Sequence, residues 1–541
     1  MDAFATHDVF NQPPPFFPRD LWADDMALRE AVAREGAQGF APRLAAYGAL
    51  AGAELPALAD EAHRDRPRLC AYDRYGHRID QVAFHPAYHR ILQAAIEHGV
   101  AGLSWAQPGP GAHVARAALS YLHYQVEPGS SCPLTMTHAA VPVLRQVPAL
   151  RHWAEKAQAF AYDGGDRPMA AKPGVTLGMG MTEKQGGSDV RANTTRAEPL
   201  AVPGEYALVG HKWFFSAPMS DGFLVLAQAP GGLTCFLLPR WRPDGSRNAL
   251  RLRRLKDKLG DWSNASSEVE FEQAWAQRIG EEGRGVATIL EMVMLTRLDC
   301  MLGSAGLMRI ALAQALHHAR HRQAFGRPLL QQPLMRSVLA DLALEAEAAI
   351  AFAFRVAGAV DRAGGDAREA AYARIATALG KYWICKRAPA FANEAQECLG
   401  GAGYVEESGL PRLYRQAPLN SIWEGSGNIQ CLDVLRALAR EPATAQALLA
   451  EWEAARGHDP AFDAALAALA PQLASGVPEA QARFLVERLA LLAQGAILLR
   501  AGHPLAADWC RTRLAAGGGA TYGALAAAVD VGAALARVLP D

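Results

Sequence analysis

A glycine-rich turn that carries hydroxyl side chains is the first stretch of this sequence that could do chemistry. It reads GMGMTEKQGGSDV from Gly178 to Val190, after an apolar run that predicts a buried strand. Small residues leave backbone N–H groups free to face a ligand, and the Thr182 and Ser188 hydroxyls add donors and acceptors. The turn suits a ligand with clustered polar or negative atoms, although a Gly-Gly-Ser sequence alone is more often a plain turn. It lacks both the GxGxxG spacing and the lysine of a P-loop.

A single carboxylate in an apolar setting is the second candidate. Glu424 follows Ile422 and Trp423, whose side chains could exclude water from it. A water-poor site raises the pKa of a carboxylate, which suits it to act as a general base. The alternative is that Glu424 interacts with the N-terminus of the helix that follows it. The residues alone leave both interpretations open.

Composition narrows the class of protein. The 541 residues exceed one ordinary core and suggest three or four units, and the formal net charge of −1 provides no whole-chain attraction to nucleic acid or membrane. The 8 cysteines are scattered without a CxxC pair, which predicts reduced thiols and no zinc site. The N-terminal residues do not resemble a signal peptide, and the longest apolar stretch, 489–499, is too short to span a bilayer. We therefore expect a cytoplasmic protein with no membrane segment and no metal.

The pattern along the chain predicts a mostly α protein with an inserted antiparallel β domain. Helical periodicity runs from about 26 to 161, short β-rich runs alternate with turns up to 280, and long helical segments follow. Those long segments suggest a four-helix bundle whose fourth helix starts near Glu424. We expect four units: an N-terminal arm and helical domain, a β domain, a helical bundle and an extra C-terminal helical domain, at 1–172, 173–280, 281–440 and 441–541.

Five motifs in order resemble the acyl-CoA dehydrogenase family. They are, as they stand in this sequence, Thr182–Asp189 (TEKQGGSD), Lys212–Ser216 (KWFFS), Arg322–Pro328 (RQAFGRP), Leu399–Tyr404 (LGGAGY), and Tyr414-Arg415 with Ile422–Ser426 (IWEGS). The resemblance implies that family's fold, an FAD cofactor, and Glu424 as the base that removes the α-proton of an acyl-CoA thioester. It also implies a homotetramer, in which the turns at Phe325 and Gly400-Gly401 complete the flavin site of a neighbouring subunit.

The same resemblance implies a set of cofactor contacts. They are Met181, Thr182, Gly187, Ser188, Trp213, Phe214, Phe215, Ser216, Arg322, Phe325, Gln332, Gly400, Gly401, Trp423, Gly425, Ser426 and Asn428. The sequence departs from the family pattern at several of the neighbouring positions, which predicts altered diphosphate and adenine contacts. Lys184 replaces a proline, Pro333 and Glu397 each replace a glutamine, and Gln416 replaces an aspartate.

Further stretches, including the arm THDVFNQP and the extra C-terminal residues, resemble the AidB-like, alkylation-response branch of the family. That branch implies association with double-stranded DNA of low sequence specificity, for which the only basic cluster of the added domain is Arg500, Arg511 and Arg513. A solvated helix face is the alternative for these three residues. Three functions compete. The first is a DNA-alkylation-response flavoprotein with weak dehydrogenase activity, and the second is a conventional dehydrogenase of short branched acyl-CoA that passes electrons to an electron-transfer flavoprotein. The third is a flavin-bearing structural protein whose active site is vestigial.

Overall fold

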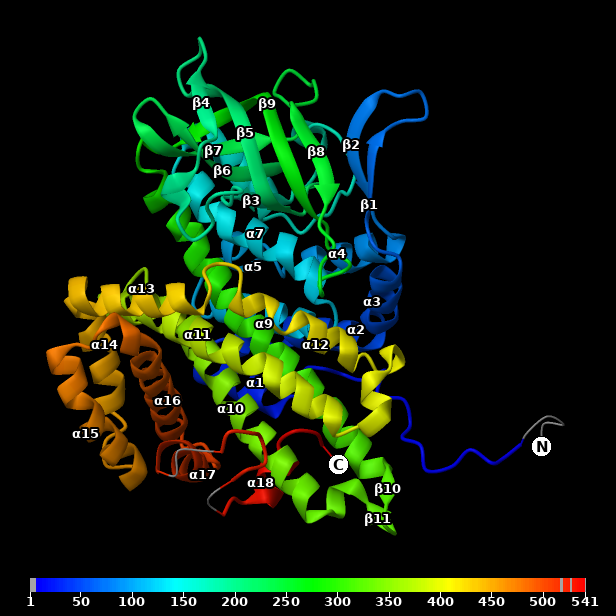
Figure 1. The fold of residues 1–541 in the computed structure, drawn as a ribbon, viewed down its shortest axis with the longest axis vertical. Coiled ribbons are helices and arrows are strands. Elements are labelled where there is room, and N and C mark those ends of the chain that lie inside the picture. Colours follow the sequence, from blue (N-terminus) through cyan, green and yellow to red (C-terminus); the bar gives the residue numbers. More distant parts are fainter. Residues whose placement is uncertain (1–5, 516–518, 526–527, 541) are drawn as a thin grey trace.

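The computed structural model describes residues 6–515, 519–525 and 528–540. Its β domain lies at one end of the molecule and the helices of the bundle at the other, with the C-terminal helices beside the bundle (Figure 1). Helix α9 (Gly285–His321) joins the two ends, because it begins beneath the β domain and packs against α10 (Pro333–Arg362) and α11 (Ala367–Glu397) in the bundle. No helix among the described residues is long and apolar enough to cross a membrane.

The N-terminal domain is helical but includes a hairpin that the periodicity did not predict. Strands β1 (Arg68–Tyr72) and β2 (Arg78–Ala83) pair antiparallel and pack against the edge strand of the β domain, so tertiary packing stabilises this short hairpin. The helices are α1 (Met26–Arg34), α2 (Ala41–Ala53), α3 (Leu55–Arg64), α4 (Pro86–His98), α5 (Leu103–Ala106), α6 (Ala112–Tyr124), α7 (Pro128–Arg145) and α8 (Arg151–Ala157).

The β domain is a sheet that curls on itself. Strand β6 pairs with both β4 and β7, and the path from β4 through β5 and β9 returns to β7, which encloses an apolar core. Most pairs are antiparallel, as expected, but β3 and β4 run parallel to β6. The strands are β3 (Leu177–Gly180), β4 (Arg196–Pro199), β5 (Glu205–Ser216), β6 (Gly222–Ala229), β7 (Gly232–Pro239), β8 (Leu250–Leu255) and β9 (Ser266–Ile279).

The bundle contains the expected long helices, with one informative difference. The fourth helix, α13 (Gly427–Arg440), starts after Glu424, because Glu424 and Gly425 have left-handed φ angles of 58° and 93° that a helix cannot include. Short elements connect the helices: β10 (Gln323–Ala324), β11 (Arg327–Pro328) and α12 (Leu410–Gln416).

The C-terminal helices form a layer on the bundle. Helix α16 (Ala482–Arg500) packs against α10, α11 and α13, and its apolar residues join the main core cluster. The remaining helices are α14 (Pro442–Glu453), α15 (Pro460–Ser475), α17 (Ala506–Cys510) and α18 (Val531–Ala536). The added domain therefore shares its core with the bundle.

Candidate active site

The carboxylate of Glu424 lies between the first half of α9 and the middle of α11. The Thr296 hydroxyl of α9 donates to Glu424 Oε2 at 2.7 Å. The buried Lys381 ammonium of α11 donates to the backbone carbonyls on either side, those of Trp423 and Gly425. Neither its side-chain hydrogen bond nor its backbone conformation makes Glu424 a cap of α13, so the structure does not support the helix-capping alternative.

Two further donors hold the backbone of this segment. Arg297 Nε donates to the Glu424 carbonyl at 2.9 Å, and Gln430 Nε2 donates to the carbonyls of Glu424 and Gly425 at 3.1 and 2.9 Å. A non-glycine residue with positive φ is strained, by roughly 1–3 kcal/mol, and persists only when its surroundings over-determine it. The hydrogen bonds from Lys381, Arg297 and Gln430 hold the backbone in this conformation. None of these three residues was predicted from the sequence.

The electrostatic setting of Glu424 suits a base. Burial raises the pKa of its carboxyl above the ordinary value, while the Thr296 hydrogen bond and the positive charges of Lys381 and Arg297 act in the opposite direction. The carboxylate therefore combines raised basicity with cations that keep it ionisable. Of the predicted contacts, Trp423 and Met181 both pack against the hydrophobic cluster that lies beneath the β domain.

The two predicted flavin segments of the β domain are bonded to each other. Buried Glu183 of the loop pairs with buried Lys212 of β5 at 2.7 Å, and the Trp213 amide donates to the Thr182 carbonyl at 2.8 Å. Burial alone would raise the pKa of Glu183, but the Lys212 charge and further hydrogen bonds lower it to about 2. The glutamate and lysine of the two motifs therefore act as a structural link that fixes the loop against the strand.

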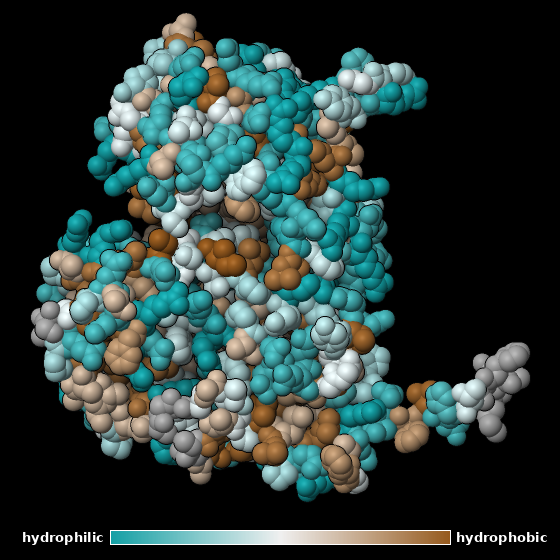
Figure 2. All heavy atoms as spheres, viewed as in Figure 1, coloured by the Kyte–Doolittle hydropathy of each residue, from teal (hydrophilic) through white to brown (hydrophobic). Residues whose placement is uncertain are grey.

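The loop and the adjoining turn leave donors open for a ligand. In the described part of the chain, no hydrogen bond within the protein uses the Gly187 and Ser188 amides or the hydroxyls of Thr182, Ser188 and Ser426. Gly187 and Ser188 are exposed, and a side chain on Gly187 would approach Thr182 within 3.2 Å. Figure 2 shows the surface hollowed between the β domain and the helices below it. This donor set fits a cofactor with a polar, phosphate-bearing body.

Among the predicted cofactor contacts at the end of β5, some side chains are at least partly exposed and one is buried. Phe214 is 53% exposed and Ser216 is half-buried, its hydroxyl 3.1 Å from that of Ser266. Phe215, in contrast, is fully buried in the β-domain core against Phe223. The structure therefore contradicts Phe215 as a cofactor contact through its ring: a bulge in the pairing of β5 with β9 turns that side chain inward.

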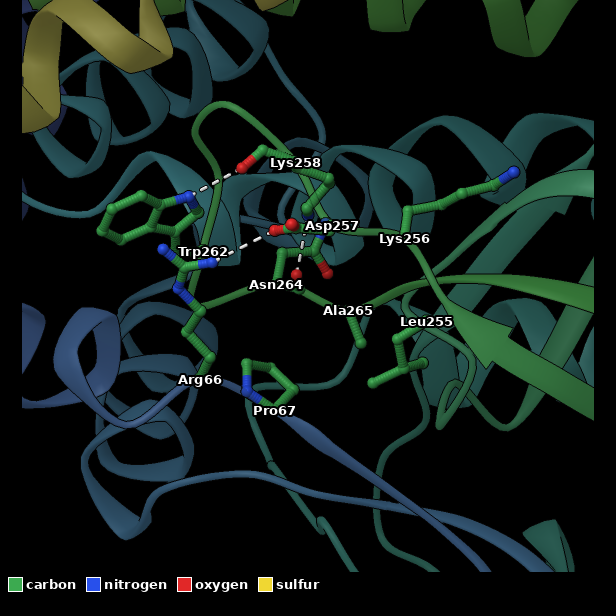
Figure 3. Close-up of a pocket in the computed structure, with 9 residues that line it drawn as sticks. All are labelled: Arg66, Pro67, Leu255, Lys256, Asp257, Lys258, Trp262, Asn264 and Ala265. Atoms are coloured by element: carbon green, nitrogen blue, oxygen red, sulfur yellow. Dashed lines mark hydrogen bonds and ion pairs between the residues drawn. The ribbon is translucent and has the colours of Figure 1, made fainter.

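Cations surround the exposed aromatic residues at this strand end. Lys256 Nζ lies 3.4 Å from the centre of the Trp213 ring, and Lys184 Nζ lies 5.3 Å from it. Lys256 also lines a cavity of about 160 Å³ with eight other residues, one of which is Trp262 beneath the Arg66 guanidinium (Figure 3). The Lys256 side chain points away from Trp262 in that view, and its ammonium group lies over the Trp213 ring.

The remaining predicted contacts lie at the other end of the molecule. Thr296 and Arg322 are separated along α9, and at 1.5 Å per residue their separation is roughly 40 Å. Phe325 is 95% exposed at the β10–β11 turn, while Arg322 donates to the Asn11 carbonyl of the N-terminal arm at 2.7 Å. Gln332 bonds the same turn, through the Ala324 carbonyl at 3.0 Å. These residues and the exposed turn at Gly400-Gly401 do not join the Glu424 site within one chain.

The three arginines predicted to contact DNA do not form a free basic surface. Arg513 is partly buried and pairs with buried Asp341 of α10, Arg500 pairs with Glu451, and Arg511 pairs with Asp508. Their charges are therefore matched by carboxylates, and this corrects the sequence-based prediction of a shared basic cluster. The physical reason is that α10 and α14 bring acidic side chains from elsewhere in the sequence against Arg513 and Arg500, while Asp508 lies one helical turn before Arg511.

Comparison with protein families agrees with the architecture. Residues 11–164 match the adaptive response protein AidB N-terminal domain, residues 178–274 the acyl-CoA dehydrogenase middle domain, and residues 283–439 the acyl-CoA dehydrogenase C-terminal domain. These matches cover the N-terminal domain, the β domain and the bundle.

Individual relatives extend the similarity to the added domain. The AidB protein of Escherichia coli (strain K12), a candidate acyl-CoA dehydrogenase, is 51% identical over 95% of this chain and 96% of its own length. Acyl-CoA dehydrogenase family member 11 of Caenorhabditis elegans is 31% identical over 76% of this chain and 69% of its own length. The solved structure of Caenorhabditis elegans ACDH-11 in complex with C11-CoA superposes with a TM-score of 0.85, at 26% identity, over 99% of this chain and 93% of that one. With its fold, motif order and relatives in agreement, this chain belongs to the acyl-CoA dehydrogenase family, in its AidB-like branch.

Proposed function

We propose that this protein is an FAD-dependent acyl-CoA dehydrogenase-type oxidoreductase in which Glu424 removes the α-proton of an acyl-CoA thioester. The observation that carries the proposal is the Glu424 segment. Its carboxyl has a raised pKa, and the side chains of Lys381, Arg297 and Gln430 hold its backbone by hydrogen bonds. The related Caenorhabditis elegans protein was solved with an acyl-CoA bound, which supports this substrate class.

The residues would divide the chemistry in a simple way. FAD, when bound, accepts the β-hydrogen of the substrate as a hydride, which together with loss of the α-proton leaves an α,β double bond. Glu424 would receive the proton on its carboxylate, and the hydrogen bond from Thr296 to Oε2 would orient the other carboxylate oxygen, Oε1, toward the substrate. The Gly187 and Ser188 amides and the Thr182, Ser188 and Ser426 hydroxyls would hold the cofactor, while Trp423 and Met181 exclude water from the site.

Anaerobic bleaching of the flavin tests this proposal. Mixing the purified holoprotein with straight- and branched-chain acyl-CoA thioesters should reduce the flavin absorbance, and deuterium at the α-carbon should slow the change. 2,2-Dimethylpropanoyl-CoA, which has no α-hydrogen, is the matched control and should leave the flavin oxidised. Bleaching by that control, or its absence with every other thioester, would rule the proposed reaction out. An electron-transfer flavoprotein is the proposed acceptor, checked by reoxidation of the reduced protein.

Assembly into a homotetramer is part of the proposal. The Arg322, Phe325 and Gly400-Gly401 elements lie too far along the bundle to reach the FAD of their own chain, and Phe325 and nearby Leu334 are 95% and 83% exposed. A second copy that covers these apolar side chains would bring Arg322 to a neighbour's cofactor. Sedimentation of the holoprotein as a monomer with full FAD occupancy would contradict this arrangement.

A second function, in the response to DNA alkylation, rests on the likeness to AidB over nearly the whole chain. We propose that the protein binds double-stranded DNA with weak sequence preference and limits alkylation damage. Phosphate contacts should then dominate, so the affinity should fall steeply with salt. Titration of the full-length protein with two unrelated duplexes at several salt concentrations tests this. A salt-independent affinity, or no binding at low salt, would contradict it.

A further inference from the structure

The cations of the added C-terminal domain fall into two groups. Residues 441–541 contain seven arginines and no lysine, and six of the seven pair with a carboxylate. The exception is Arg483, at the start of α16. Its Nε donates to a neutral amide oxygen, Asn428 Oδ1, at 2.8 Å.

Arg483 meets the bundle at the turn that follows the base. Asn428 lies in the first turn of α13, four residues after Glu424 in the sequence. Lys386 of α11 approaches the same turn, because a Cβ atom on Gly427 would lie 3.3 Å from its Cε atom. Burial raises the pKa of Cys431, one turn further along α13, to about 11, and both Arg483 and Lys386 oppose that rise. Two cations from different domains therefore flank one turn.

Neither cation is neutralised. In the part of the chain that the structure describes, no ion pair joins Arg483 or Lys386 to a carboxylate, and both side chains are exposed. Glu487, the acidic residue of α16, pairs with Arg488 at 4.0 Å. The guanidinium Nη1 and Nη2 groups of Arg483 and the Lys386 ammonium remain as donors, and the hydroxyl of Ser426, two residues before Asn428, has no partner among the described residues.

We propose that Arg483 and Lys386 form an anion subsite that binds the diphosphate of FAD, so that the added domain contributes to the cofactor site. The inference rests on the proposed FAD site at Gly425–Asn428. A guanidinium and an ammonium are the side chains best suited to a diphosphate, and a second domain can supply them here because α16 packs on α11 and α13. They add positive charge in a chain whose Glu397 places a carboxylate where the family pattern has a neutral amide.

Cofactor binding to the stripped full-length protein tests the subsite. FAD and riboflavin, which has no phosphate, are titrated by quenching of flavin fluorescence against wild type, Arg483→Met, Arg483→Lys and Lys386→Met. Arg456→Met is the control, because Arg456 is an exposed arginine of the same domain that pairs with Glu453. We expect Arg483→Met to weaken FAD binding roughly tenfold, equivalent to about 1.4 kcal/mol, and to leave riboflavin binding unchanged. Arg483→Lys should recover part of the loss, and Arg456→Met should have no effect.

Several outcomes would overturn the subsite. FAD affinity within twofold of wild type in both methionine variants, with unchanged thermal unfolding, removes the proposal. Equal losses for FAD and riboflavin would mean that Arg483 supports the local structure and binds no phosphate. If the variants weaken the binding of acyl-CoA alone, or of duplex DNA alone, the two cations bind a phosphate of that ligand and not the diphosphate of FAD. A wild-type protein that binds neither flavin would instead refute the FAD site itself, which is the earlier proposal.

Discussion

Cations at two places in this molecule bind different kinds of partner: backbone carbonyl groups at one place and a carboxylate at the other. At the Glu424 segment, Lys381 and Arg297 donate to backbone carbonyls, and the Thr296 hydroxyl is the one group of the described residues that donates to the nearby carboxylate. Where the C-terminal domain meets the bundle, Arg513 bonds directly to Asp341. The first arrangement orients a carboxylate and leaves it basic, whereas the second neutralises one.

The comparison shows that the partner of a cation decides its role. A buried ion pair is strongly destabilised when one member is removed, because the other is left charged in a poorly solvated place. A cation on carbonyl groups instead fixes backbone geometry and acts on neighbouring ionisable groups at a distance. Variants at the two places should therefore affect different properties: chemistry at the first, and folding at the second.

The largest expected effect is at the base itself. Glu424→Gln should lower the rate of flavin bleaching by acyl-CoA about a thousandfold or more, because an amide cannot accept the α-proton. Stopped-flow absorbance measures the rate, and FAD content and thermal unfolding should match wild type, since glutamine can still accept the Thr296 hydrogen bond. A variant that bleaches at the wild-type rate would show that another residue is the base.

The next effect is on stability. Arg513→Ala should reduce the free energy of unfolding by about 3–5 kcal/mol, because it leaves Asp341 buried without its cation. Chemical denaturation measures the change, and the double variant Arg513→Ala with Asp341→Asn should recover part of it. If Arg513→Ala unfolds like wild type but loses DNA affinity, the arginine is available to DNA and the structural interpretation fails.

A smaller effect is expected at Lys381. Lys381→Met should slow bleaching roughly tenfold to a hundredfold, because the carbonyls of Trp423 and Gly425 lose their shared donor and the orientation of Glu424 loosens. The activity of wild type should fall as the pH drops through the raised pKa of Glu424, since the protonated acid cannot act as the base.

The pH profile separates positioning from simple loss of structure. The Lys381 charge, the Arg297 charge and the Thr296 hydrogen bond each lower the pKa of Glu424. Removal of the lysine charge should therefore raise that pKa and move the acid limb, the fall of activity at low pH, to higher pH. Arg368→Met, on the same helix but exposed and outside the proposed cofactor site, is the control and should keep the wild-type limb. A slower Lys381→Met variant with an unmoved acid limb would indicate that the lysine has no electrostatic effect on the base.

The smallest effect is expected at Arg511. Its pair with Asp508 is partly exposed, so Arg511→Ala should cost less than about 1 kcal/mol of stability. Because the guanidinium already has a carboxylate partner, DNA affinity at a given salt concentration should change less than twofold. A larger fall in DNA affinity, measured by fluorescence anisotropy, would restore Arg511 to the candidate DNA surface.

Long elements were predictable from the sequence, and short ones were not. The long helical segments expected after the β domain are present as α9, α10 and α11, because thirty or so residues of helical pattern outweigh local exceptions. The β1–β2 hairpin was missed: its short strands depend on packing against β8, which no local pattern reveals. Phe215 was misassigned because a bulge in β5 decides which face its side chain takes.

The sequence by itself determined the family, the order of the domains and the residue types of the site, because five motifs carry them at their own positions in the chain. Only the tertiary structure decided which of those residues meet. It linked the flavin loop to β5 through Glu183 and Lys212, and it placed Thr296 and Lys381 around Glu424. It also matched Arg513 with Asp341 and left Arg483 beside Asn428 without an acid. Each of these partners comes from a distant part of the chain, and the chemistry of a charged side chain depends on its partner as much as on its own type.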